Sequence, residues 1–363
     1  MSELQEICSY AKGKTNVSEL TLTNYISTEN MLPNKSGIVN ATSLPTTATT
    51  QEYLKNDILV SNIRPYFKKI WYATKKGGCS NDVLVFRAKE NIDSKFLYYL
   101  LTDDAFFEYS MATSKGTKMP RGDKLSIMQY NVPDFDLTTQ KQIASILSAL
   151  DDKIELNNRI NENLESQAQA LYNKFFSPKS NSTGTIKTLD MYCSIFTGKK
   201  NANAAIDNGS YKFFTCSPDA LKIDSYIYDG NAIIISGNGA YTGRTRFYSG
   251  KFDLYQRTYA CTILSELNPD YIYPLYWFVK FELSQKIMGG TRGSAIPYIV
   301  MNDLAKFEFV FNEDLFNQYM IMFKNITLAI QQNEFENEKL ALLRDTLLPK
   351  LMNGEIDVSE VKI

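Results

Sequence analysis

In two long stretches of the chain, mainly hydrophobic residues recur at alternating spacings of four and three residues. In the first stretch these positions are Ile143, Leu147, Leu150, Ile154, Asn157, Asn161, Leu164, Ala168, Leu171 and Phe175. In the second, 176 residues later, they are Tyr319, Phe323, Ile326, Ile330, Asn333, Asn337, Leu340, Arg344, Leu347 and Leu351. Spacing sustained over five heptads predicts two long helices that pair as a coiled coil.

Two positions of each predicted seam are asparagines. A seam asparagine costs stability but fixes the register, because its amide is satisfied only opposite another polar group. An antiparallel pairing brings Asn157 to Asn337 and Asn161 to Asn333. The alternative, in which each helix packs on its own domain and the asparagines are solvated, is the less favoured one.

The remainder of the chain also contains an internal repeat. Leu4–Ser9 returns as Leu189–Ser194, 185 residues later, and Ile58–Ser61 returns as Ile233–Ser236, 175 residues later. The difference predicts a loop-sized excess of about ten residues before Ile58 in the first copy. Aromatic and β-branched segments predict strands at 57–63, 70–74 and 83–87, and a helix is expected at 95–109.

These patterns predict an α+β fold, with two pseudo-twofold-related mixed α/β domains joined by two long antiparallel helices. The expected segments are a first mixed domain at 1–137, a first helix at 138–177, a second mixed domain at 178–313, a second helix at 314–353 and a tail at 354–363. Pro349 is expected to kink or end the second helix a turn early. Asn353-Gly354 supplies its stop signal.

Composition narrows the possible chemistry. The chain is 44% hydrophobic and 22% charged, which is typical of folded domains, and it contains no histidine. That absence excludes His-activated serine or cysteine nucleophiles, imidazole bases and His-ligated zinc. The five cysteines are scattered, and the sequence shows neither a signal peptide nor an apolar run of 18 residues. We therefore expect a soluble, cytoplasmic protein with reduced thiols.

Charge is divided unevenly between the mixed domains and the helices. The whole chain has 39 basic and 40 acidic residues. Residues 1–137 have 16 basic and 15 acidic residues, and 178–311 have 14 and 11, whereas 312–363 have 5 and 9. This small bias fits mixed domains on a polyanion and helices on protein partners.

Loops that follow equivalent strands in the two copies carry side chains suited to phosphates and base edges. The first loop is Arg64–Lys69 and the second is Gly237–Arg246. A solvated hairpin is the simpler interpretation of either loop alone, but the recurrence favours DNA contact. The candidates for readout are Arg64, Tyr66, Lys68, Lys69, Asn238, Tyr241, Arg244 and Arg246.

A second basic turn is duplicated as well. Glycine exposes backbone N–H groups there, and the neighbouring hydroxyls and cations suit a phosphate. The candidates are Lys115, Thr117 and Lys118 in the first copy, and Thr291 and Arg292 in the second. Lys118 and Arg292 are the leading phosphate candidates.

A glycine pair after the second apolar strand imitates a nucleotide-binding loop. The distance from Gly237-x-Gly239 to Gly243 is one residue too long, however, and Arg244–Tyr248 predicts a strand rather than a helix. The sequence also lacks a P-loop and an amino-methyltransferase tetrapeptide. We expect no catalytic site in this chain.

The duplicated plan and one motif resemble the specificity subunit of type I restriction–modification systems. The motif is Val132-Pro133-Asp134-Phe135 followed by Gln140-Lys141-Gln142-Ile143-Ala144, which leads into the helix 147–176. The second copy matches through Gln318 and 340–354, although Val310-Phe311-Asn312 lacks the proline. The resemblance covers essentially the whole chain.

The resemblance implies a non-catalytic role. Each mixed domain would be a target recognition domain that reads one half of a split double-stranded DNA site. The helices would dock two methyltransferase subunits for adenine N6 methylation, with or without two motor-nuclease restriction subunits. S-adenosylmethionine, ATP and Mg would be bound by those partners. The alternatives are a subunit of a methylation-only system, a coiled-coil adaptor whose duplicated domains bind proteins, and last an enzyme acting alone.

Overall fold

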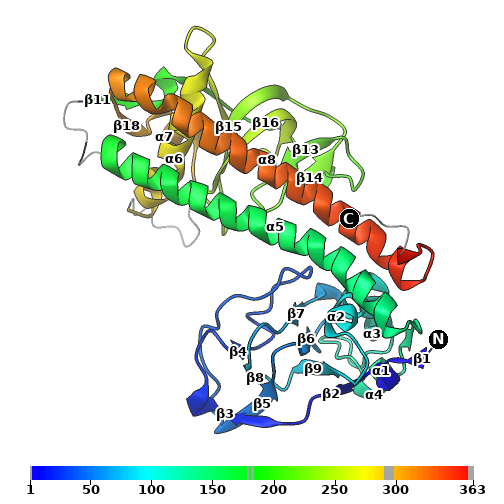
Figure 1. Ribbon diagram of the computed structural model, residues 1–363. Coiled ribbons are helices and arrows are strands. Elements are labelled where there is room, and N and C mark those ends of the chain that lie inside the picture. The colour runs from blue at the N-terminus through cyan, green and yellow to red at the C-terminus, as the bar shows by residue number, and fades with distance from the viewer. Residues whose placement is uncertain (1, 178–179, 181–183, 290–297, 359–363) are drawn as a thin grey trace. The chain divides into compact units, whose positions relative to one another are not determined.

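The computed structural model describes residues 2–177, 180, 184–289 and 298–358 (Figure 1). The chain forms two compact units. Unit 1 comprises residues 1–154 and 338–363, and unit 2 comprises residues 155–337. Within the described ranges, no helix has both the length and the apolar character needed to cross a membrane.

Unit 1 contains a mixed domain of short strands and helices. Its strands are β1 (Ser2–Glu3), β2 (Cys8–Tyr10), β3 (Lys14–Asn16), β4 (Tyr25–Ile26), β5 (Thr49–Tyr53), β6 (Ile58–Ser61), β7 (Ile70–Tyr72), β8 (Gly77–Cys79), β9 (Val83–Ala88) and β10 (Asn131–Val132). Its helices are α1 (Leu4–Ile7), α2 (Ser94–Thr102), α3 (Asp104–Ala112) and α4 (Lys124–Met128), with 3-10 turns η1 (Val17–Glu19) and η2 (Pro65–Phe67).

The central strand β6 is buried on both faces. It lies in the four-stranded sheet β2-β9-β6-β7, beside a second sheet of order β3-β5-β8-β4. Side chains alternate between the faces of a strand. Accordingly, Ile58 and Val60 join the core with α2 and α3, while Leu59 joins the smaller core under the second sheet. This double burial explains why the segment is uninterruptedly apolar.

Unit 2 repeats this plan around a larger sheet. Its strands are β11 (Thr185–Thr188), β12 (Cys193–Thr197), β13 (Tyr211–Phe214), β14 (Leu221–Ile223), β15 (Tyr228–Ser236), β16 (Thr245–Leu254), β17 (Thr258–Ile263) and β18 (Glu308–Phe311). Its short helical elements are η4 (Leu189–Met191), η5 (Ala202–Ala204), η6 (Pro269–Tyr271), α6 (Ile272–Gly289) and α7 (Met301–Ala305). The sheet order is β12-β17-β15-β16-β13-β14.

Sheet registers confirm the internal repeat. The order β2-β9-β6-β7 corresponds to β12-β17-β15-β16, and the paired residues are displaced by the predicted 175 or 185 positions. The equivalent pairs are Ile58–Phe86 and Ile233–Cys261, Val60–Ile70 and Ile235–Thr245, and Cys8–Ala88 and Cys193–Ile263. The copies diverge where the extra residues were expected. There the first copy builds a separate sheet, whereas the second adds β13 and β14 to the main one.

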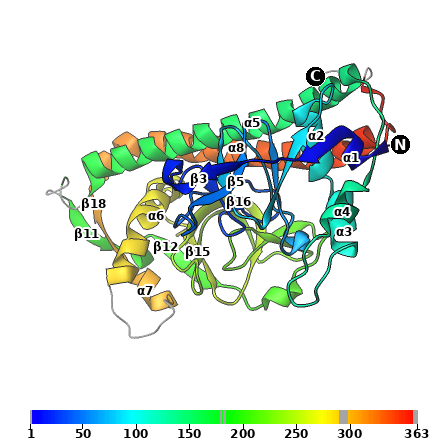
Figure 2. The ribbon, with the colours of Figure 1, turned by 90° about the horizontal axis from the view of Figure 1, so that it is seen from below.

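The long helices are α5 (Leu137–Leu171), continued by the π-helical turn η3 (Tyr172–Phe176), and α8 (Glu313–Met352). In unit 2 the C-terminal half of α5 packs beside the N-terminal half of α8. Asn157 Nδ2 donates to Asn337 Oδ1 at 2.9 Å, and Asn333 Nδ2 donates to Asn161 Oδ1 at 2.7 Å. These are the contacts that the antiparallel register predicts, and the separately packed alternative is excluded (Figure 2).

The remaining halves of the two helices meet within unit 1. Ile143 and Leu147 of α5 share the main core with Leu348 and Leu351 of α8. One seam position is an arginine, and Arg344 Nη1 donates to Asp151 Oδ1 at 2.7 Å. Apolar packing and a partly buried ion pair therefore hold this end of the seam.

One expectation about helix continuity was wrong, and of the two effects expected of Pro349 the early end of the second helix does not occur. The helix expected at 95–109 is two helices, because Asp103 takes an extended conformation and its side chain accepts a hydrogen bond from Ala105 N, capping α3. Helix α8 runs through Pro349 to Met352 instead of ending early. Leu348, Leu351 and Met352 are buried, so packing holds the last turn although proline removes one donor. Gly354, with φ of 74°, then ends the helix as expected.

The seam asparagines yield a stability prediction. Replacing Asn337 by leucine removes a partner of the Asn157 amide, whose side chain is buried, and we expect a loss of about 1–3 kcal/mol in the free energy of unfolding. The double variant Asn157→Leu/Asn337→Leu should recover most of this loss. Asn325→Leu, at an exposed position of α8, is the matched control. Denaturant unfolding measures all three, and a double variant as unstable as the single one would contradict the pairing.

Candidate nucleic-acid interface

The two basic segments predicted in the first copy lie side by side in unit 1. The loop after β6 and the turn at 115–121 are joined by an isolated β-bridge between Ile63 and Arg121. In addition, Arg64 N–H donates to Pro120 O at 2.8 Å, and Gly122 N–H donates to Asn62 O at 3.2 Å. Backbone contacts thus assemble one surface from segments some 50 residues apart in the sequence.

The cations of this surface divide into two groups. Lys68 Nζ lies 2.9 Å from Asp104 Oδ2, and Lys35 binds the other oxygen of the same carboxylate. Partial burial acts to raise the pKa of Asp104, but the two lysines outweigh it and lower that pKa below its ordinary value. Lys69 Nζ donates to Thr28 O at 2.6 Å, and burial lowers its pKa. Lys68 and Lys69 are therefore occupied within the domain.

Arg64 and Tyr66 are differently placed. Both are exposed, and neither side chain makes a hydrogen bond or ion pair with any residue that the structure describes. Arg64 caps η2 with a left-handed backbone, φ of 51°, and this directs the turn that carries Tyr66. These two side chains are available to an external ligand.

The turn at 115–121 presents the first copy's phosphate candidates. The backbone N–H groups of Lys115 and Arg121 each donate to the carbonyl oxygen of the other residue. Gly116, which leads from Lys115 to the tip of the turn, has φ of 94°. Lys115 also forms an ion pair with Asp123, and that hydrogen bond lowers the pKa of Asp123 to about 2. Thr117 and Lys118 are exposed at the tip, and Lys118 contacts no acidic side chain within the described ranges.

The corresponding loop of unit 2 follows β15. Gly237 N–H donates to Arg257 O, and a Cβ at Gly237 would lie only 2.5 Å from that oxygen, so the close approach requires glycine. Asn238 forms an isolated bridge with Tyr298. The exposed Arg244 guanidinium lies 5.6 Å from the centre of the exposed Tyr241 ring. The loop leads into β16, so the strand that the sequence predicts after this loop is confirmed.

The other candidates of unit 2 differ in availability. Arg246 donates to Ser217 O and lies 5.8 Å from the Phe214 ring centre. Burial, followed by the nearby charge of Arg244, lowers the pKa of Arg246. This arginine is largely occupied within the fold. Thr291 and Arg292 lie outside the described residues.

Sequence reasoning missed Arg121. It is exposed, forms backbone bridges with Ile63 and Lys115, and its guanidinium lies 3.1 Å from Asp82. The sequence feature that could have identified Arg121 is its place as the third basic residue of this segment, three positions after Lys118. The bridging role depends on strand pairing, which the sequence does not reveal.

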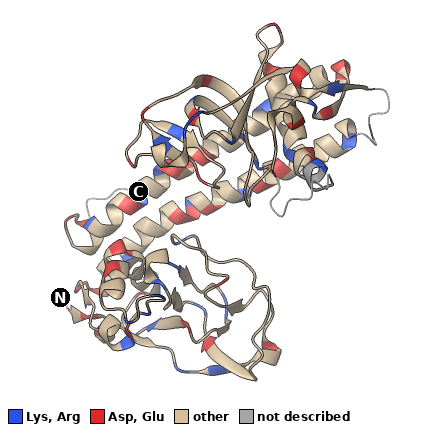
Figure 3. Cartoon of the chain, turned by 180° about the vertical axis from the view of Figure 1, so that it is seen from behind, with Lys and Arg blue, Asp and Glu red and all other residues tan. Residues whose placement is uncertain are grey.

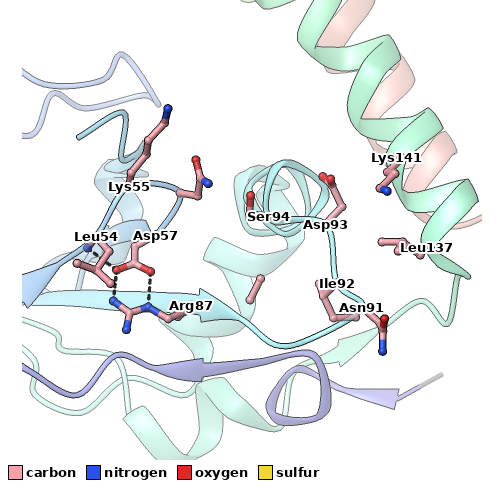
Figure 4. A pocket seen from close by; sticks show the side chains of 12 residues that line it. Leu54, Lys55, Asp57, Arg87, Asn91, Ile92, Asp93, Ser94, Leu137 and Lys141 are labelled. Atoms are coloured by element: carbon pink, nitrogen blue, oxygen red, sulfur yellow. Dashed lines mark hydrogen bonds and ion pairs between the residues drawn. The ribbon is translucent and has the colours of Figure 1, made fainter. Parts of the chain in front are cut away.

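A polar pocket of about 500 Å³ lies at the opposite end of β6 from the basic loop (Figure 4). Its one fully buried carboxylate, Asp57, accepts two hydrogen bonds from Arg87, at 2.7 and 2.6 Å, and one from Leu54 N–H at 2.7 Å. These bonds leave Asp57 unsuited to act as a general base. Among the residues that the structure describes, no three metal-ligating side chains gather into a site.

Parts of this architecture also occur in known proteins. Equivalent mixed domains on an antiparallel helix pair define a duplicated two-domain scaffold. Residues 1–166 match the family model of the type I restriction modification DNA specificity domain. The chain is 31% identical over 167 residues to the type I restriction enzyme EcoDI specificity subunit of Escherichia coli, covering 44% of this chain and 36% of that protein.

Two further relatives extend over more of the chain. The MjaIX specificity subunit of Methanocaldococcus jannaschii is 23% identical over 309 residues, covering 75% of this chain and 71% of that protein. The crystal structure of a type I restriction–modification S subunit from M. genitalium has the same fold, with a TM-score of 0.58 and 17% identity over 97% of this chain and 99% of that one. The first part of the chain, residues 1–166, is therefore similar to type I specificity subunits, and the chain as a whole has the fold of an S subunit.

The division between occupied and available cations predicts a contrast in stability. Lys69→Met removes the bond to the Thr28 carbonyl and should lower the free energy of unfolding by about 1 kcal/mol. Lys118→Met, an equal change at an exposed tip, should change it by less than about 0.5 kcal/mol. Denaturant unfolding of both variants tests this, and equal losses would show that Lys69 has no internal role.

Proposed function

We propose that this chain is the DNA-reading specificity subunit of a type I restriction–modification complex. Each mixed domain reads one half of a bipartite double-stranded DNA target. The observation that carries the proposal is that the loops after the equivalent strands β6 and β15 each carry an exposed arginine, Arg64 or Arg244, to which the described residues supply no ion pair. Arginine binds guanine edges with two hydrogen bonds, so such a residue in each domain suits sequence readout.

The chain contributes recognition and scaffolding, and partners contribute catalysis. The sequence has no histidine, and its one glycine-rich loop resembling a nucleotide site leads into a strand. Methyltransferase subunits bring S-adenosylmethionine and methylate adenine N6, and motor-nuclease subunits, where present, bring ATP and Mg. Because its substrate is chromosomal DNA, the complex acts in the cytoplasm.

Helix α8 offers a surface for a methyltransferase subunit. Within unit 2, Ile321, Leu328 and Phe335 recur every seven residues at the position opposite the seam, and they are 61%, 38% and 38% exposed. The outward-facing heptad positions of α5 within unit 2 are the polar residues Arg159, Ser166 and Asn173. A solvated coiled coil has polar residues at such positions, so the apolar row on α8 favours a protein partner. Acidic residues along both helices add charge for that contact (Figure 3).

Methylation mapping of the host genome tests the proposal directly. Deleting this gene should abolish one split adenine-methylation motif, and re-expression should restore it. An unchanged methylation pattern, with the methyltransferase shown to be present, would overturn the proposal in favour of a protein-binding adaptor.

Readout and phosphate contacts predict different phenotypes. Arg244→Ala should cost about 1–3 kcal/mol of binding to the target and relax one base position of one half-site. Lys118→Ala should weaken binding to all sequences alike and reduce the salt dependence by about one counterion. Binding of the assembled complex to DNA variants at several salt concentrations measures both. Uniform loss in Arg244→Ala would assign that residue to phosphate.

The apolar row predicts where the partner binds. Leu328→Glu should weaken methyltransferase binding by tenfold or more, because it places a charge in an apolar contact, while leaving the unfolding midpoint unchanged. Ser166→Glu, on the polar outer face of α5, is the control. Titration of partner into labelled chain measures both, and equal affinities in the two variants would exclude this surface.

A further inference from the structure

Backbone strain is concentrated next to the basic loop of unit 1. Six non-glycine residues in the described ranges have positive φ, and four of them are Asn34, Lys35, Arg64 and Lys68, at 55°, 62°, 51° and 50°. Left-handed conformations are unfavourable for side chains other than glycine and persist only where surrounding contacts impose them. Such clustering indicates a turn that its surrounding contacts hold in one conformation.

The contacts that impose this conformation join two turns. Asn34 N–H donates to Phe67 O at 2.8 Å, and Lys35 N–H donates to Lys68 O at 2.9 Å. The Lys35 and Lys68 ammonium groups share the Asp104 carboxylate at 2.7 and 2.9 Å. We call residues 64–68, held in this way, the aromatic turn.

The aromatic turn presents two aromatic rings to solvent. Tyr66 is 49% and Phe67 is 37% exposed, and their centroids are 4.7 Å apart with an interplanar angle of 52°. Lys69 Nζ lies over the Phe67 ring at 5.7 Å from its centre. Insertion between base pairs needs both faces of a ring to be free, and Lys69 covers one. The exposed part of Phe67 suits contact with a protruding apolar group instead.

We propose that Phe67, supported by Tyr66, contacts a thymine C5-methyl group in the half-site read by the first domain. This inference rests on the proposed DNA-reading function. The methyl group is the apolar feature that a base pair presents in the major groove, and phenylalanine is suited to it. The exposed cation Lys118 provides phosphate attraction that brings the turn to DNA. A half-site methylated on adenine has at least one thymine on its opposite strand.

The second domain differs at this position. Tyr66 corresponds to Tyr241, which is also exposed, but Phe67 corresponds to Thr242. Thr242 Oγ1 donates to Gly239 O at 2.8 Å. The phenylalanine contact therefore belongs to the first domain alone, and the other half-site serves as an internal control.

The experiment is a cycle of protein and DNA changes in the assembled complex with its methyltransferase subunits. Each thymine of the mapped target is replaced in turn by deoxyuridine, which lacks the methyl group, and the dissociation constant is measured for wild type and Phe67→Ala. One substitution in the first half-site should weaken wild-type binding about fourfold, as expected for one buried methyl group. Phe67→Ala should bind the thymine target more weakly and should not respond to that substitution.

Matched variants separate readout from folding. Phe67→Leu should retain part of the sensitivity to the methyl group, and Leu125→Ala, an exposed apolar position in the same unit, should bind like wild type. Deoxyuridine in the second half-site should affect wild type and Phe67→Ala equally. A Phe67→Ala chain with an unchanged unfolding midpoint excludes a folding defect.

The outcomes distinguish this inference from the proposed function. If wild type binds its target specifically but no deoxyuridine substitution matters, or if the same substitution weakens Phe67→Ala equally, the thymine contact is overturned and DNA reading stands. If 2-aminopurine placed in the target became more fluorescent on binding wild type but not on binding Phe67→Ala, Phe67 would insert between base pairs. That result would overturn the thymine contact. If wild type shows no preference for the target over scrambled DNA, the proposed function itself fails.

Discussion

The register of the antiparallel seam is the constraint on which the packing of the two long helices within each unit depends. Apolar heptads alone tolerate a slip of seven residues, because one apolar side chain replaces another. Asn157 does not tolerate it, since its side chain is 1% exposed and its amide donates to both Asn337 and Glu336. After such a slip a buried amide would lose its partners, a cost that exceeds the gain from any single apolar contact. At the other end of the seam, the Arg344–Asp151 pair adds the same type of constraint within unit 1.

The two mixed domains share a constant frame and differ in the loops that it carries. Strand pairing in the two mixed domains follows the same register, and β6 and β15 are buried on both faces by equivalent residues. Those strands cannot vary much without loss of packing. The loops that leave their C-terminal ends contribute little to the core, so Phe67 and Thr242 differ at one position of one frame. Divergence of these loops therefore requires no change in fold.

The sequence predicted the parts of this molecule that depend on periodicity. The heptads, the asparagine pairing and the repeat offsets follow from spacing alone, and each is present in the structure. It did not predict the break at Asp103, because local capping decides it, and it left open whether Pro349 ends the second helix early, because distant packing decides that. Nor did it distinguish Lys69 from Arg64. The partner of Lys69 is the Thr28 carbonyl, 41 residues away in the sequence, and only tertiary structure brings the two together.

Internal ion pairs neutralise several cations of the basic surface in a chain whose net charge is −1. Three aspartates lie among the basic segments of unit 1, where Asp82 pairs with Arg121, Asp104 with Lys68, and Asp123 with Lys115. These pairs remove cations from the pool that attracts any phosphate, and non-specific affinity grows with that pool. They also hold the loops in shape, so that the exposed cations that form no such pair among the described residues project from fixed positions. Low non-specific attraction and fixed geometry together favour discrimination between DNA sequences over raw affinity. Base contacts specify the sequence, whereas phosphate contacts only position the protein.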